Sequence, residues 1–301
     1  NCIEYMEAVV ALLQIGAVHV NVNYRYTARE LHYIFDNADA RAVIYHREFE
    51  SRLDDILPEL PKVEYAVCVG GGPGAPVAWA AKHRCQWLAF DSLLTPSTAQ
   101  VDYSHDPTDQ FFMYTGGTTG LPKGVMWSQD KLFQMFGINY FCTQGPTQPD
   151  SIDALETMWR NNDHYTEMVV APMMHGLGVY SLLPTLAFGG TVVTSSARRF
   201  DADAAWEAIA QYRVQALKIP GDAMGKPLLE ALERRDRRDD LAQFSLLISS
   251  AAVFSMHVKK ALVAALPKLQ LLDILGGSES AALGHSALSS AGNDSSDQDP
   301  S

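Results

Sequence analysis

The sequence YTGGTTGLPKG, residues 114–124, continues an apolar, strand-like run that begins at Gln110. Glycine allows backbone N–H groups to approach an anion closely, and threonine hydroxyls add donors that can reach phosphate oxygens. Lys123 contributes a mobile positive charge. Together these residue types predict a loop that wraps a polyphosphate.

This loop differs from the Walker A phosphate loop, in which Gly-Lys-Ser/Thr opens a helix. Here Pro122 precedes Lys123, Gly124 follows it, and helical spacing begins only near Ser128. We therefore expect another kind of phosphate site. The residues predicted to bind phosphate in this loop are Thr115, Gly116, Gly117, Thr118, Thr119, Gly120, Lys123 and Gly124.

The segments around the loop alternate between helical and strand patterns. Before it, Thr27 and Glu30 have capping-box spacing ahead of an amphipathic helix, and residues 41–45 and 64–69 are short apolar strands. After it, strands are expected at residues 167–171, 191–194, 214–219, 245–249 and 270–272. Such alternation predicts an α/β fold with mixed, largely parallel sheets flanked by helices.

The composition excludes several classes of protein. The chain has 301 residues, 47% of them hydrophobic, which is enough for a sizeable core. Its formal net charge of −12 argues against a nucleic-acid partner, and no apolar run is long enough to span a membrane. The four cysteines show no CxxC spacing, which favours reduced thiols in a cytoplasmic protein over a zinc or redox site.

Further segments follow the loop in a characteristic order. They are NVNYRYTAREL at residues 21–31, PMMHG at 172–176, GGT at 189–191, SSAAVFS at 249–255 and LDILGGSE at 272–279. With YTGGTTGLPKG, this ordered set resembles the AMP-forming adenylating enzymes, which include acyl-CoA synthetases, firefly luciferase and peptide-synthetase adenylation domains. The continuation Val125-Met126-Trp127 resembles the bacterial fatty-acid–CoA ligase branch.

The resemblance implies roles in catalysis. Lys123 and Thr118 would hold the β- and γ-phosphates that leave as pyrophosphate, and Glu279 would ligate Mg²⁺, which prefers carboxylate and phosphate oxygens. Ser278 stands where the family usually has threonine, and would offer its hydroxyl to the α-phosphate. Gly116 replaces a usual serine and so removes one hydroxyl donor.

The resemblance also implies residues around the adenine and the acyl group. Ala251, Asp273 and Gly276 would lie on the adenine side, and His175 would line the acyl entrance as a catalytic-site residue. Leu275 departs from the family, which usually has tyrosine or phenylalanine at this position. Leucine still covers a base but does not stack on it as an aromatic ring does.

The resemblance covers most of the chain but not all of the family's machinery. We expect residues 1–284 to form an N-terminally trimmed AMP-binding large domain and residues 285–301 to be a disordered, low-complexity tail. The family's ribose-binding aspartate, hinge and late lysine have no candidate here. We therefore expect the C-terminal lobe to be absent and turnover by this chain to be very weak.

The predicted reaction joins a carboxylic acid to CoA with ATP and Mg²⁺, through an acyl-adenylate. The acid is expected to be fatty, aromatic or steroid-derived, a small-molecule partner. Two alternatives stay open: another adenylate-forming enzyme, such as a peptide-synthetase adenylation domain, and a non-catalytic nucleotide-binding remnant. No acidic residue accompanies PMMHG to meet an amino group, which favours an acid without an amine.

Overall fold

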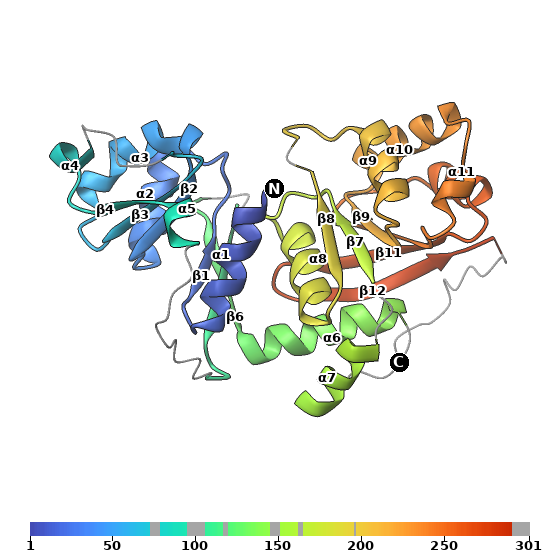
Figure 1. Ribbon diagram of the computed structural model, residues 1–301, viewed down its shortest axis with the longest axis horizontal. Coiled ribbons are helices and arrows are strands. Elements are labelled where there is room, and N and C mark those ends of the chain that lie inside the picture. The colour runs from blue at the N-terminus through green and yellow to red at the C-terminus, as the bar shows by residue number, and fades with distance from the viewer. Residues whose placement is uncertain are drawn as a thin grey trace. The chain divides into compact units, whose positions relative to one another are not determined.

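The computed structural model describes residues 1–72, 79–94, 106–116, 120–144, 151–161, 165–195 and 197–290. The chain divides into two compact units: an N-terminal unit, Ile3–Gln129, and a C-terminal unit, Asn1–Cys2 with Asp130–Ser301 (Figure 1). Both are built from sheets, mostly parallel, with flanking helices, which confirms the expected α/β class. Among the described residues, no helix has the length and apolar character needed to cross a bilayer.

The N-terminal unit contains two three-stranded sheets, ordered β1-β5-β6 and β2-β3-β4. Its strands are β1 (His19–Asn21), β2 (Ala42–His46), β3 (Tyr65–Val69), β4 (Gln86–Ala89), β5 (Gln110–Thr115) and β6 (Lys123–Ser128). Its helices are α1 (Ile3–Gln14), α2 (Ala28–Asn37), α3 (Glu50–Ile56), α4 (Trp79–Lys82) and α5 (Phe90–Leu93), with short 3₁₀ turns at Arg47–Phe49 and Leu57–Glu59. All pairs are parallel except β5 with β6.

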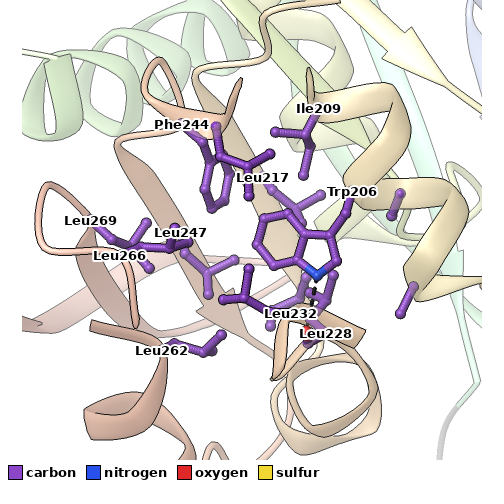
Figure 2. Packing of buried hydrophobic residues seen from close by; sticks show 14 of the residues in the cluster. Trp206, Ile209, Leu217, Leu228, Leu232, Phe244, Leu247, Leu262, Leu266 and Leu269 are labelled. Atoms are coloured by element: carbon purple, nitrogen blue, oxygen red, sulfur yellow. Dashed lines mark hydrogen bonds between the residues drawn. The ribbon is translucent and has the colours of Figure 1, made fainter. Parts of the chain in front are cut away.

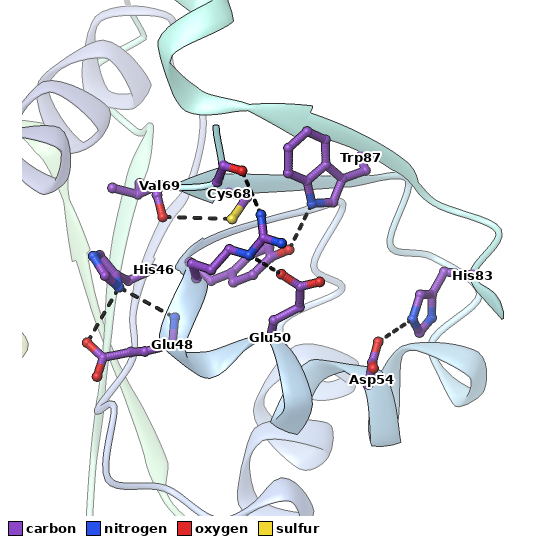
Figure 3. Close-up of polar contacts among 11 residues, drawn as sticks. His46, Glu48, Glu50, Asp54, Cys68, Val69, His83 and Trp87 are labelled. Carbon is purple, nitrogen blue, oxygen red and sulfur yellow. Dashed lines mark hydrogen bonds and ion pairs between the residues drawn. The ribbon is translucent and has the colours of Figure 1, made fainter. Parts of the chain in front are cut away.

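The capping box predicted ahead of α2 is present. The Glu30 backbone N–H donates to Thr27 Oγ1, and the Thr27 backbone N–H donates to Glu30 Oε2 at 2.8 Å. Behind this helix, Ile34 and Phe35 join a core with Trp87. Within that core, Trp87 Nε1 donates to the Tyr45 hydroxyl at 3.1 Å (Figure 3).

The C-terminal unit is built on one six-stranded sheet, ordered β12-β11-β10-β9-β7-β8. The strands are β7 (Thr166–Val169), β8 (Thr191–Thr194), β9 (Ala216–Ile219), β10 (Leu246–Ser250), β11 (Gln270–Gly277) and β12 (Ala281–Leu288). The helices are α6 (Gln129–Gln144), α7 (Ile152–Asn161), α8 (Gly176–Ala187), α9 (Ala202–Gln211), α10 (Asp222–Arg234) and α11 (Met256–Ala265), with a 3₁₀ turn at Asp239–Leu241. Only β12 runs antiparallel to its neighbour.

Helices cover both faces of this sheet. Met168, Leu217, Leu247 and Leu271 are aligned across four strands, so their side chains point to one face. That face packs on α9, α10 and α11, where Trp206 donates from Nε1 to the Leu228 carbonyl at 2.9 Å (Figure 2). The opposite face meets α8, which contacts β7, β8 and β9 (Figure 1).

Two strands depart from the sequence-based expectation. Residues 285–288, expected to begin a disordered tail, instead complete β12, because they pair with residues 271–274 of β11 and so share its backbone hydrogen bonds. Residues 291–301 lie outside the described part of the chain. Strand β6 was also not predicted: it lies between the phosphate loop and the expected helix, so Lys123 and Gly124 belong to a hairpin strand.

The charged run RRDRRDD at residues 234–240 covers the end of α10 and the segment that follows it. α10 ends at Arg234, which pairs with Asp203, and Arg235 pairs with Asp240. These pairs involve largely exposed or partly exposed side chains, so they add little to stability.

Candidate functional site

The predicted phosphate loop connects the two strands of the β5–β6 hairpin. Thr115 is aligned with Lys123, and Tyr114 with Gly124, so the two ends of the loop face each other across the hairpin. Gly117, Thr118 and Thr119, the centre of the predicted site, lie outside the described residues. The structure therefore places the base of the loop, including the exposed Lys123 side chain, which has no partner among the described residues.

Tyr114 anchors this hairpin to the rest of the N-terminal unit. Its hydroxyl donates to Asn37 Oδ1 at the end of α2, with a distance of 2.7 Å. Its ring lies over Gly124 so closely that a Cβ added there would be 3.2 Å from the Tyr114 Cζ atom. The packing of the hairpin therefore favours glycine at position 124, since a larger residue would require the Tyr114 ring to shift.

Glycine is also needed at the end of the loop. Gly120 has a φ of +125°, which residues with a Cβ rarely adopt, and a Cβ there would meet no atom within 4 Å. The backbone conformation, not crowding, therefore selects glycine at this position. Gly116 lies at the other end, where the nearest atom to an added Cβ is the Tyr26 hydroxyl at 4.0 Å.

The predicted residues of the C-terminal unit gather along one edge of its sheet. β7 leads through α8 to β8 on one side, whereas β9, β10 and β11 follow on the other side of β7. In parallel sheets, ligands bind at the carboxyl ends of the strands where the order reverses in this way. His175 follows β7, Ala251 follows β10, and Ser278 and Glu279 follow β11, all at that edge.

Ala251 begins the loop that joins β10 to α11 and has a φ of +67°, a strained conformation for alanine. The loop is held by Asp222 at the start of α10: the Asp222 N–H donates to the Val253 carbonyl at 2.9 Å, and the Ser255 N–H donates to Asp222 Oδ1 at 2.8 Å. Hydrogen bonds from Ser255 lower the pKa of Asp222 to about 2. Asp222 was not among the predicted site residues.

Asp273, predicted on the adenine side, already has an ion-pair partner within the protein. Its carboxylate forms an ion pair with Lys259, a buried lysine on α11 that lies 5.6 Å from the Phe254 ring centroid. Lys259 was not among the predicted site residues. The ion pair ties β11 to α11 and fixes the direction of the Asp273 side chain.

The candidate metal ligand lies in the tight turn between β11 and β12. Glu279 is exposed there, beside Gly276 and Gly277, and Leu275 is 72% exposed. The described residues contain no group of three His, Cys, Asp or Glu side chains that could hold a metal by themselves. One exposed carboxylate nevertheless fits Mg²⁺, which takes one or two protein carboxylates and completes its shell with phosphate oxygens and water.

His175 is the residue before α8 and has an extended backbone, with φ −112° and ψ 156°. Its side chain is exposed, whereas the preceding Met173 and Met174 are buried. The segment before the helix packs against Gly178 in its first turn. A Cβ added to Gly178 would be 2.4 Å from the Pro172 carbonyl oxygen. This close approach explains the glycine and leaves His175 at the carboxyl edge of the sheet.

A polar cluster lies behind that edge, on the α8 face of the sheet. Glu167 of β7 is buried and Lys218 of β9 is largely buried, with 3.4 Å between Lys218 Nζ and Glu167 Oε1. The Thr185 hydroxyl of α8 donates to Glu167 Oε2 at 2.9 Å. Charged residues inside short strands are the only sequence signal for this cluster.

The sequence matches the AMP-binding enzyme family over residues 1–300. It is 34% identical, over 285 residues, to the medium/long-chain-fatty-acid–CoA/3-oxocholest-4-en-26-oate–CoA ligase of Mycobacterium marinum. It is 33% identical, over 284 residues, to the 3-oxocholest-4-en-26-oate–CoA ligase of Rhodococcus rhodochrous. Each match covers 93% of this chain but 50% of the relative, so the chain spans about half the length of these curated relatives.

Solved structures agree on the fold. A long-chain-fatty-acid–CoA ligase from Archaeoglobus fulgidus superposes with a TM-score of 0.70 at 21% identity, covering 94% of this chain and 52% of that one. The luciferase-like enzyme of the mealworm Zophobas morio gives a TM-score of 0.73 at 20% identity, covering 95% and 60%. At these identities the likeness concerns the fold alone.

Proposed function

Because this chain belongs to the AMP-binding enzyme family, we propose that it is the nucleotide-binding part of an acyl-CoA synthetase. In the proposed reaction, a carboxylate oxygen attacks the α-phosphorus of ATP and pyrophosphate leaves, giving an acyl-adenylate. The thiol of CoA then attacks the acyl carbon, and AMP leaves with the electron pair of the broken C–O bond. Adenylation replaces a poor leaving group by a good one.

The observation that carries this proposal is the hairpin register that sets Lys123 opposite Thr115 at the base of the glycine- and threonine-rich loop. We assign Lys123 and Thr118 to the departing phosphates, where charge-assisted donors stabilise developing negative charge. The backbone amides of residues 116–120 and the hydroxyls of Thr115 and Thr119 add further donors.

We assign metal and α-phosphate contacts to the turn after β11. Glu279 would ligate Mg²⁺, which neutralises phosphate charge when bound, and Ser278 would donate its hydroxyl to the α-phosphate. Ala251, Asp273 and Gly276 would border the adenine. Leu275 would cover the base without the stacking energy of an aromatic ring.

The acid is proposed to be a fatty or steroid-derived carboxylic acid, since the names of the relatives specify such acids. His175 and the buried Met173 and Met174 support this assignment, because methionine adapts to irregular apolar ligands. We also propose a cytoplasmic setting, in which Cys68 and Cys85 stay free thiols, as they are here.

The test is a calorimetric titration of this chain with Mg²⁺-ATP and with non-hydrolysable acyl-AMP analogues carrying fatty, steroid or aromatic acyl groups. Lys123→Ala should weaken binding about 10- to 100-fold, since a hydrogen bond to a charged group contributes about 1.5–3 kcal/mol. Lys268→Ala, which removes an exposed lysine just before the amino end of β11, serves as the charge-matched control. Equal affinity in the two variants would contradict the assignment of Lys123.

A second function is nucleotide binding without turnover, because the exposed Leu275 would orient the adenine less firmly for reaction than the usual aromatic ring. The two are separated by measuring pyrophosphate release from ATP with a panel of acids. Release that depends on the acid supports adenylation. Binding of Mg²⁺-ATP with no release under any acid supports the non-catalytic alternative.

A further inference from the structure

A proline inside α8 creates an unusual link between this helix and the sheet. Pro184 has no backbone N–H, so the carbonyl four residues earlier, that of Tyr180, loses its helical hydrogen-bond partner. Lys218 of β9 supplies a donor instead, since its Nζ lies 3.5 Å from the Tyr180 carbonyl oxygen. The proline therefore leaves the Tyr180 carbonyl able to accept a hydrogen bond from a residue of a neighbouring strand.

That lysine is itself held in place. Its ammonium group lies 3.4 Å from Glu167 Oε1, and the other carboxylate oxygen of Glu167 accepts hydrogen bonds from Thr185 of α8 and from Tyr165 at 3.3 Å. Glu167 is only 2% exposed. A buried, hydrogen-bonded charge pair has few alternative geometries, so it fixes how this part of α8 sits on β7 and β9.

Tyr180 extends from this fixed backbone to the turn that carries the candidate metal ligand. Its hydroxyl donates to the Ser278 carbonyl at 3.0 Å, and its ring centroid lies 6.4 Å from that of Phe136. The Ser278 carbonyl belongs to the peptide unit that also contains the Glu279 N–H. Because a peptide unit is planar, fixing this carbonyl also fixes the direction in which the chain enters Glu279.

We propose that Tyr180 is a positioning residue that orients the turn of Ser278 and Glu279 and thereby sets how strongly Mg²⁺ promotes nucleotide binding. This inference rests on the proposed function, in which Glu279 ligates the metal. Tyr180 acts through the turn and is not assigned any contact with the nucleotide. The Tyr180 hydroxyl connects α8 directly to this turn.

The test compares Tyr180→Phe with Tyr165→Phe. Each removes one tyrosine hydroxyl within the same unit, but the Tyr165 hydroxyl contacts Glu167 and not the turn. The first readout is amide hydrogen exchange of residues 278–281 in the chain without nucleotide. The second is the ratio of ATP dissociation constants measured by calorimetry with EDTA and with excess Mg²⁺.

Tyr180→Phe should accelerate exchange at residues 278–281 about tenfold and reduce the Mg²⁺ enhancement of ATP binding about fivefold, measured as the ratio of the dissociation constants in EDTA and in excess Mg²⁺. Tyr165→Phe should alter neither. Unchanged exchange in Tyr180→Phe would overturn the positioning role, whether or not ATP binds. Faster exchange in a chain whose wild type binds no Mg²⁺-ATP would retain the structural link and reject the proposed function. Faster exchange with an unchanged Mg²⁺ enhancement would overturn the inference for nucleotide binding.

Discussion

The imidazole of His19 is stacked on the ring of Phe111, with ring centroids 4.9 Å apart and planes 14° from parallel. The two residues are aligned on β1 and β5, and the ring of Tyr5 meets the imidazole edge-on. His19 is 7% exposed, and its Nδ1 atom has no hydrogen-bond partner among the described residues. Burial lowers the pKa of His19 from 6.5 to about 4.

This pairing predicts a pH-dependent stability. Because the folded-state pKa lies below the unfolded value of 6.5, the unfolded chain binds a proton that the native chain rejects between pH 6.5 and about 4. Native stability is therefore full above pH 6.5 and falls as the pH decreases through this window, by about 3 kcal/mol. His19→Leu should remove this loss. Urea unfolding from pH 4 to 8 measures it.

The matched control is His257→Gln, which removes an exposed histidine of α11. Its stability should follow the wild-type pH profile. If the free energies of unfolding of wild type and His19→Leu fall in parallel between pH 6.5 and 4, His19 is not held neutral by burial.

A second prediction concerns Gly221, which precedes α10 with φ +53° and ψ −142°. This region is open almost only to glycine, and an added Cβ would lie 2.3 Å from the Val253 carbonyl oxygen. Gly221→Ala should therefore lower the free energy of unfolding by about 3 kcal/mol, from backbone strain and overpacking. Gly284→Ala, where an added Cβ meets no atom within 4 Å, should change it by less than about 0.5 kcal/mol. Similar urea midpoints for the two variants would contradict this reasoning.

The secondary structure was predictable where a segment carries its own signal. The Thr27–Glu30 capping box and the strand at residues 191–194 were both identified from local pattern and confirmed. β12 was not, because its sequence, AALGHSAL, has neither strong alternation nor β-branched residues. β12 is a strand because it pairs with β11. This pairing cannot be deduced from the composition of the segment.

The candidate site divides in the same way. The candidate phosphate loop and the candidate metal ligand Glu279 were predicted from short motifs, since their residue types must occur close together in sequence. The residues that hold these segments in place do not form short motifs. Tyr114 and Asn37 are 77 positions apart in the sequence, and Tyr180 and Ser278 are 98 positions apart. Such contacts exist only once the sheets are assembled, so Tyr114, Tyr180 and Lys259 were not predicted as positioning residues.

The buried pair of Glu167 and Lys218 leads to a prediction about energetic coupling. Removing one member leaves the other charge without its counter-ion away from water, which costs about 3 kcal/mol or more. Glu167→Gln keeps acceptors for the hydroxyls of Tyr165 and Thr185, and Lys218→Met keeps most of the side-chain volume. The double variant should be more stable than the sum of the single losses implies, by about 1–3 kcal/mol. Additive losses in urea unfolding would show that the charges do not interact.

The last prediction concerns Mg²⁺ and Glu279. A glutamine retains the size of the side chain but lacks the negative charge that a hard cation prefers. Glu279→Gln should leave ATP binding in EDTA unchanged while reducing the Mg²⁺-dependent gain in affinity about tenfold. Calorimetric titration with ATP at several Mg²⁺ concentrations measures both quantities.

Glu233→Gln, which neutralises an exposed glutamate at the end of α10, controls for the general loss of one negative charge. If both variants lower the Mg²⁺ effect equally, net charge accounts for the change and Glu279 is not a ligand. If Glu279→Gln also weakens binding in EDTA, the residue acts on the nucleotide directly. If only the Mg²⁺-dependent gain is lost, the exposed turn between β11 and β12 provides the protein's carboxylate to the metal, and its orientation by Tyr180 becomes a means of tuning nucleotide affinity.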